Sequence, residues 1–241
     1  MTYFILFLAG ILAYLISTLA AGGGALIMVP LVGFYLSPAH VAPVVNLGNM
    51  IGRPSRLILF WKHIDWHIVK FYVPFAIAGA LLGGFLFVKL QAQWLQVLLG
   101  LFLISTVFQF QFGKKKSAFP MKAAYFMPLG FTVTFTSTLF GATGPIMNPF
   151  YLNMGLVKER MIATKTANSF LAGIAQLSSY AFLGALEGEM WFYGMAIGLG
   201  ATLGNVIGKR QLKKVSDNRF RQYVIALMVV SGVLMVGKGL V

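Results

Sequence analysis

Cysteine is absent from this chain of 241 residues, and acidic residues are scarce. Without cysteine, disulfides, thiolate metal sites and thiol redox chemistry are excluded. Only 5 residues are Asp or Glu, against 19 Lys or Arg, and charged residues make up 10% of the chain. A typical soluble domain is about a quarter charged. The composition therefore points away from a protein that folds in water.

Apolar side chains take the place of the missing charges: they make up 59% of the chain, and the mean hydropathy is +0.82. At about 20 residues for each crossing helix, this length accommodates roughly eight to ten membrane segments and no soluble domain. The first 21 residues are apolar but lack a basic leading region, which predicts a retained segment rather than a cleaved signal. The sequence predicts an all-α integral membrane protein.

The formal net charge of +14 has two interpretations. In a soluble protein it would indicate nucleic acid as the partner. In a membrane protein, basic residues gather in cytoplasmic loops. No basic run here is long or interleaved with stacking aromatics. The expected partner is therefore the lipid bilayer and not nucleic acid.

Ten apolar stretches divide the chain into two series of five. The first series covers residues 3–21, 25–36, 39–61, 68–90 and 94–112. The second covers residues 123–140, 145–156, 161–183, 190–209 and 220–240. The second stretch of each series spans only about 18 Å as a helix, which is too short for a hydrocarbon core of about 30 Å. In both series it follows a glycine-rich break.

The second series repeats the first at a distance of about 120 residues. Five matches occur in order: residues 17–19 with 137–139, Pro30 with Pro149, Asn49 with Asn168, residues 79–84 with 200–205, and Gln96 and Ser105 with Gln222 and Ser231. We therefore predict a first membrane repeat at residues 1–112, a cytoplasmic basic linker at 113–121 and a second membrane repeat at 122–241. Together they form one transmembrane domain.

Five segments in each half, an odd number, would give two inverted repeats. If each short stretch is its own leg, crossing partway or returning as part of a re-entrant hairpin, the basic loops share one face. These loops carry Lys62, Lys70, residues 114–116, Lys158, Arg160 and residues 209–214. The acidic loop 187–189 and the charge-poor loop 91–93 then fall on the other face. The positive-inside rule makes the basic face cytoplasmic and both termini external.

The breaks at residues 22–24 and 141–144 predict a binding site. Non-helical backbone at membrane depth survives only inside protein or beside a watery cavity, because lipid cannot satisfy its amides. Each short stretch begins with free N–H groups and the positive end of a helix dipole, which attract anions. Paired broken helices in an inverted repeat are also typical of transporter binding sites. Tight turns at a helix interface are the alternative interpretation.

Polar residues near the breaks complete the expected site. The residues expected to bind an anion are Gly23, Gly24, Asn46, Asn49, Thr143, Gly144, Lys165 and Asn168, with Ser17, Thr18, Arg53, Ser137 and Thr138 as further candidates. The asparagines could instead join helices, and Lys165 could extend to the cytoplasmic face. Extension to that face is the favoured interpretation for Arg56. Glycines spaced by four at residues 79–83 and 194–208 indicate close helix packing.

All five acidic residues lie in loops or at the ends of segments, so no carboxylate is predicted within a span. The charges inside the membrane are then positive, which favours an anion. An enzyme is not expected, because no span holds a carboxylate, a cysteine or a histidine cluster for acid–base or nucleophilic work. His63 and His67 could ligate a metal, but beside Trp61 and Trp66 they indicate an interfacial belt. No metal or cofactor is expected.

Residues 21–31, Ala-Gly-Gly-Gly-Ala-Leu-Ile-Met-Val-Pro-Leu, and their degenerate copy at 141–149, Gly-Ala-Thr-Gly-Pro-Ile-Met-Asn-Pro, resemble the sulfite exporter TauE/SafE family. The region 46–49 and the duplicated Gly-Ala-x-Leu-Gly are similar to it too, so the resemblance covers nearly the whole chain. It implies a carrier in the bacterial inner membrane for sulfite, sulfonates or related sulfur anions. Ala142 and Thr143 replace glycines in the second break, which brings equal roles of the two halves into question.

The resulting hypothesis is a secondary transporter of a small sulfur oxyanion or organosulfonate. It would work by alternating access, with the anion near the midplane between the breaks. An anion-selective channel and a membrane-protein assembly factor without transport activity are the alternatives. The sequence leaves open the anion, the direction of transport, the coupling ion and the oligomeric state, a homodimer included.

Overall fold

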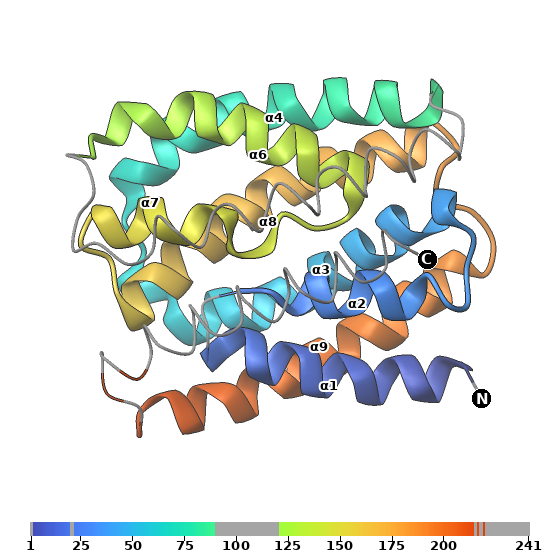
Figure 1. Ribbon diagram of the computed structural model, residues 1–241, viewed down its shortest axis with the longest axis horizontal. Helices are drawn as coiled ribbons and strands as arrows, with labels where there is room; N and C mark the ends of the chain where they lie inside the picture. Colours follow the sequence, from blue (N-terminus) through green and yellow to red (C-terminus); the bar gives the residue numbers. More distant parts are fainter. Residues whose placement is uncertain (1, 20–21, 90–120, 215, 217–218, 220–241) are drawn as a thin grey trace, which may run out of the picture.

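The computed structural model describes residues 2–19, 22–89, 121–214, 216 and 219 (Figure 1). Within these ranges every regular element is a helix. In chain order they are α1 (Thr2–Leu19), α2 (Gly24–Val32), α3 (Pro38–Phe60), η1 (Trp61–His63), α4 (Trp66–Lys89), η3 (Ala123–Tyr125), α6 (Phe126–Phe140), η4 (Gly144–Met147), α7 (Asn148–Asn153), α8 (Lys158–Phe182) and α9 (Met190–Leu212). The all-α prediction is confirmed. The predicted segments at 94–112 and 220–240, and the linker 113–121 apart from Met121, lie outside the described residues.

Four helical stretches are long and apolar enough to cross a membrane: α1, α4, Ala123–Phe140 and α9. Large apolar side chains lie exposed along them, among them Phe4, Leu12, Leu81, Phe85 and Phe192. An exposed apolar surface of this kind marks contact with a membrane. The chain is a multi-pass membrane protein.

The helices form layers, which Figure 1 shows from one side. α1 packs on α9, α4 packs on α6, and these two pairs flank α3 and α8. Glycines allow this close approach: a Cβ atom on Gly200 or Gly204 would collide with carbonyl oxygens of α1, and one on Gly79 with the Phe131 carbonyl of α6. The prediction that the spaced glycines serve helix packing is confirmed.

The inner helices α3 and α8 carry the polar residues. With 23 and 25 residues, they are about 35–38 Å long at a rise of 1.5 Å per residue. Neither is among the strongly apolar spans, because Asn49, Arg53 and Arg56 interrupt α3, and Lys165 and Gln176 interrupt α8. The outer pairs shield these polar residues from lipid, so the predicted site is concentrated between α3 and α8.

Corresponding helices of the two halves run in opposite directions. In Figure 1, α1 and α3 run from right to left and α4 from left to right, whereas α6 and α8 run from left to right and α9 from right to left. The packing partners correspond as well, since α1 packs on α9 as α6 packs on α4. Two inverted repeats predict this arrangement. The number of segments in each repeat stays a prediction, because the fifth of each lies outside the described residues.

The basic loops of the described ranges gather at one end of the molecule. The end of α3, the start of α8 and the end of α9 lie at the left of Figure 1. These segments and the turn after α3 carry Lys62, Lys158 and the basic residues in 209–214. The loop 183–189, with its two glutamates, lies at the opposite end. The charge is therefore distributed as expected, while the assignment of the basic end to the cytoplasm stays a prediction.

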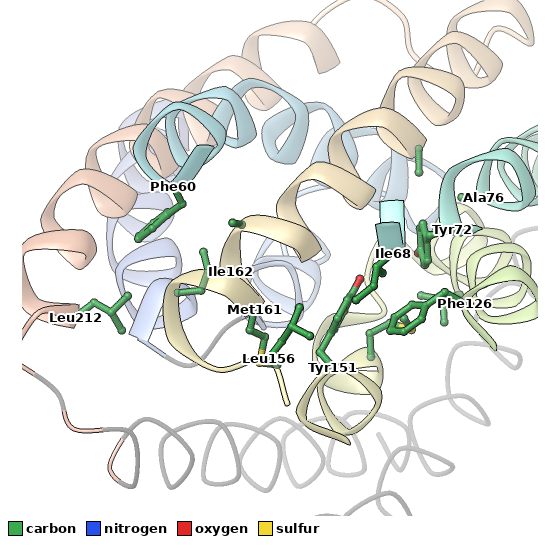
Figure 2. Packing of buried hydrophobic residues seen from close by; sticks show 14 residues of the cluster. Phe60, Ile68, Tyr72, Ala76, Phe126, Tyr151, Leu156, Met161, Ile162 and Leu212 are labelled. Carbon is green, nitrogen blue, oxygen red and sulfur yellow. The ribbon is translucent and has the colours of Figure 1, made fainter. Parts of the chain in front are cut away.

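A cluster of buried apolar side chains joins the elements at the basic end. Figure 2 shows Phe60 of α3, Met161 and Ile162 of α8, and Tyr151 of α7 beside Phe126 of α6. The rings of Phe126 and Tyr151 have their centroids 5.1 Å apart. Because Tyr151 also lines the cavity described below, this cluster fixes one wall of that cavity.

Candidate functional site

The described glycines of both breaks, Gly22, Gly23 and Gly24 in the first and Gly141 in the second, are buried inside the protein. Gly22 and Gly23 have φ angles of 135° and 98°, and Gly141 has a φ of 76°. A residue with a side chain would be strained in these backbone conformations. The N–H of Gly22 donates to the Ser17 carbonyl at 2.7 Å, and that of Gly141 donates to the Ser137 carbonyl at 2.9 Å. The glycines therefore end α1 and α6 in similar ways, because the two acceptors, Ser17 and Ser137, occupy matching positions in the sequence repeat.

A cavity of about 120 Å³ is lined by both breaks. A cavity needs about 10–15 Å³ to hold one water, so this one accommodates several waters or a small oxyanion. Its walls come from both halves of the chain. Of the predicted site residues, it is lined by Ser17, Gly23, Gly24, Asn49, Arg53, Ser137, Thr143 and Lys165.

Four further predicted residues lie buried next to the cavity without lining it: Thr18, Asn46, Thr138 and Asn168. The amide of Asn46 donates to the Tyr180 hydroxyl at 3.1 Å, and that of Asn168 donates to the Tyr151 hydroxyl at 2.8 Å. These amides are thus engaged by tyrosines. The last predicted residue, Gly144, begins η4, and its surroundings lie outside what the structure describes.

Arg56 does not extend to the membrane face, so that expectation is wrong. Its Nη2 donates to the Thr18 hydroxyl at 2.9 Å and to the Asn205 side-chain oxygen at 2.7 Å, with a longer contact of 3.3 Å to the Ser17 hydroxyl. These oxygens on α1 and α9 hold Nη2 of the guanidinium inside the protein. Arg56 therefore belongs to the cavity wall.

Three cations line the cavity, and each donates to a neutral oxygen. Arg53 donates to the Ser169 carbonyl at 2.7 Å, Arg56 to Asn205, and Lys165 to the Asn148 side-chain oxygen at 2.6 Å. Among the described residues that line the cavity, none is Asp or Glu. The cavity is therefore electropositive, as the absence of acids from the spans predicted.

The first break also contributes backbone donors. Gly23, Gly24 and Ala25 line the cavity at the start of α2. No group in the described ranges accepts a hydrogen bond from the N–H of Gly23 or Gly24. The positive end of the α2 dipole therefore faces the cavity.

The second break differs from its prediction. The single short helix expected at 145–156 is divided into η4 and the six-residue α7. Pro149 occupies the first turn of α7, where its missing N–H does no harm. Thr143 and Met147 line the cavity, whereas Asn148 at the start of α7 does not. The second half therefore brings no long helix end to the site.

Several lining residues were missed by the sequence analysis: Tyr14, Arg56, Tyr72, Tyr151, Gln176 and Asn205. Two of them carried a signal. Tyr14 precedes Ser17 by three residues, so it shares a helix face with a predicted site residue, and its hydroxyl donates to Asn49 at 2.5 Å. Asn205 stands where the first repeat has Gly84, a polar residue on a glycine packing face.

The model of one known protein family matches nearly the whole chain. This is the family described as sulfite exporter TauE/SafE, and the match covers residues 6–235. The chain belongs to the sulfite exporter TauE/SafE family. The resemblance drawn from the glycine-rich breaks is thus confirmed, and the TauE/SafE membership makes the protein a membrane transporter of sulfur-containing anions at the level of the family. No curated protein and no solved structure matches the chain.

Proposed function

We propose that this protein is a secondary transporter of a small sulfur-containing oxyanion, such as sulfite or a sulfonate. It works by alternating access in the bacterial inner membrane, with both termini external, and the anion binds in the cavity between the two breaks. The observation that carries the proposal is the composition of the cavity wall. Arg53, Arg56 and Lys165 lie there together with the start of α2, and the described lining contains no carboxylate.

The energetics of buried charge support an anionic ligand. A cation at membrane depth costs about 2.5–3.5 kcal/mol or more on insertion scales. Three in one cavity also repel each other, and neutral oxygens offset only part of this. An anion that enters the cavity attracts all three and accepts hydrogen bonds from them. Arg56 has a donor for such a hydrogen bond. Every described hydrogen bond of Arg56 is made by its Nη2, which leaves Nη1 available to a ligand.

The arrangement of the helices supports alternating access. Oppositely oriented halves with the site between them are the usual basis for rocking one half against the other. The two outer pairs, α1 with α9 and α4 with α6, are each held by glycine contacts and are joined through α3 and α8. Exit of an anion from a cell that is negative inside is favourable by about 2.3 kcal/mol per charge per 100 mV, so export needs no coupled cation.

Sulfite flux into proteoliposomes tests this proposal. We expect saturable flux that falls at least tenfold in Lys165→Ala and in Gly24→Leu, because the first removes a cavity charge and the second pushes a side chain toward Ser17 and the Tyr14 ring. Lys214→Ala is the matched control, since it removes an exposed charge outside the cavity. If both cavity variants keep the flux of the control, the site is misplaced. Single-channel currents without counterflow would indicate a channel instead.

A further inference from the structure

Both the nitrogen and the oxygen of the Asn205 side chain form hydrogen bonds. These bonds determine the orientation of the amide. The side-chain nitrogen donates to the Gly52 carbonyl at 2.9 Å and to the Ser55 hydroxyl at 3.1 Å. A carbonyl oxygen can only accept, so the nitrogen must lie on this side. The side-chain oxygen therefore faces Arg56, whose Nη2 donates to it at 2.7 Å.

The amide oxygen of Asn205 holds the Arg56 guanidinium without cancelling its charge. Asn205 is buried, with 1% of its surface exposed, and it lines the cavity beside Arg56. An aspartate has almost the same shape and would form a stronger, charge-assisted bond with the arginine. That bond would place a negative charge in the cavity wall. A neutral partner orients the cation and leaves its field directed at the cavity.

Asn148 presents the same kind of oxygen to the second half's cation. Its side-chain oxygen accepts from Lys165 Nζ at 2.6 Å. Its side-chain nitrogen is buried and has no acceptor among the described residues. An aspartate here would therefore replace an unsatisfied donor and would lose no described hydrogen bond, so the choice of asparagine is not explained by hydrogen bonding alone.

We propose that Asn205 and Asn148 are positioning residues that set the charge of the anion the cavity accepts, so that it favours a doubly charged oxyanion over a singly charged one of the same shape. The inference rests on the proposed function, because it concerns the same anion site. Its physical basis is Coulomb's law: the interaction of a wall charge with a bound anion is proportional to the charge of that anion. A carboxylate added beside Arg56 or Lys165 therefore lowers the affinity for a monoanion by some factor and the affinity for a dianion by about the square of that factor.

The test compares two anions of equal shape and different charge. Sulfite at alkaline pH is a pyramidal dianion, and chlorate is a pyramidal monoanion with the same number of electrons. Both are titrated against the purified full chain, and thermal stabilisation gives their affinities. The variants are Asn205→Asp, Asn148→Asp and the control Asn153→Asp. The control adds the same charge at the end of α7, where no described hydrogen bond joins the side chain to Arg56 or Lys165.

We expect Asn205→Asp and Asn148→Asp each to weaken the binding of chlorate about tenfold and that of sulfite about a hundredfold, while Asn153→Asp leaves both affinities unchanged. The ratio between the two anions separates a charge effect from a structural one, because a distorted cavity would weaken both alike. Unliganded melting temperatures report the folding of each variant, and Asn148→Asp keeps the test valid if Asn205→Asp does not fold. Equal weakening of both anions, or no weakening, overturns the inference. If neither anion stabilises the unsubstituted protein, the proposed function fails instead.

Discussion

The two breaks share a hydrogen-bonding framework but differ in charge. Thr18 and Thr138 occupy matching positions, and each hydroxyl donates to the carbonyl one turn earlier, at 2.9 and 2.8 Å. Each hydroxyl also accepts a hydrogen bond at 2.9 Å, from Arg56 in the first half and from Gln176 in the second. The comparison shows that a duplicated scaffold can keep its geometry while the group that donates to the matched threonine is a cation in one half and a neutral amide in the other.

The short helices differ in the same sense. α2 has nine residues and begins at the cavity, whereas η4 and α7 have four and six. Counted from the pair Asn49 and Asn168, the positions of Arg53 and Arg56 are Ala172 and Ala175 in the second half. The second half supplies Lys165 instead, where the first has Asn46. The charged contacts thus come from positions that do not match. We therefore expect the first break to dominate anion binding, although the helix packing of the two halves is expected to be equivalent.

Equivalent packing predicts equal and large losses of stability from Gly204→Val and Gly79→Val. In each, the added side chain meets a backbone carbonyl of the partner helix, Ile11 of α1 or Phe131 of α6, which cannot move aside easily. We expect about 3 kcal/mol of destabilisation, or a melting temperature lower by about 6–12 °C in detergent. A loss confined to one variant would show that the outer pairs are not equivalent.

Unequal charge predicts unequal effects on binding from Arg56→Gln and Gln176→Leu. The first removes a charged donor and should raise the KM for sulfite roughly 10- to 150-fold, while the second removes a neutral donor and should raise it roughly 2- to 10-fold. Flux assays in proteoliposomes measure both. Equal effects would mean that the two breaks contribute alike and that the charge of Arg56 is not used.

The glycine that ends α6 offers a sharper test of backbone strain against packing. Gly141 and Gly155 both have a φ of 76°, but a Cβ atom on Gly141 would meet Ala42 Cα at 2.9 Å, whereas one on Gly155 meets nothing within 4 Å. Gly155→Ala should therefore cost about 1 kcal/mol from the backbone alone, and Gly141→Ala about 2–3 kcal/mol. Thermal unfolding measures the difference in stability between the two variants. Identical losses of stability would show that packing against Ala42 contributes nothing at the second break.

The smallest effect is expected at the exposed end. Arg160 forms a salt bridge with Asp65 at 3.3 Å, and its side chain is 59% exposed. Water screens such a pair, so Arg160→Ala should change stability by about 1 kcal/mol or less and leave sulfite flux unchanged. A marked loss of flux would show that cations outside the cavity also guide the anion.

The sequence analysis predicted the features that local patterns encode. Apolar lengths predicted the helices, residues 22–24 predicted the break after α1, and four-residue glycine spacing predicted the contacts of α9 and α4. Lys165 was expected at the site because a lysine at that depth needs a polar environment. The fifth segments and the linker lie outside the described residues, so the five-segment count stays untested.

The features that were missed depend on partners far along the chain. Arg56 turns inward because Thr18 and Asn205 offer oxygens, and Asn205 lies 149 residues away. No pattern around Arg56 reveals that neighbour. Likewise, Asn46 and Asn168 donate to tyrosines on α8 and α7, so their amides cannot be assigned to a ligand from their own helices. The division of 145–156 into η4 and α7 was missed because both forms share the same apolar pattern.

Density for a bound oxyanion tests the central claim most directly. A structure of the full chain with selenite, a heavier pyramidal oxyanion, would locate the ligand by its anomalous signal. We predict a selenium peak in the cavity, within hydrogen-bonding reach of Arg56 and the N–H groups at the start of α2. A peak elsewhere, with this cavity empty at saturating selenite, would contradict the account.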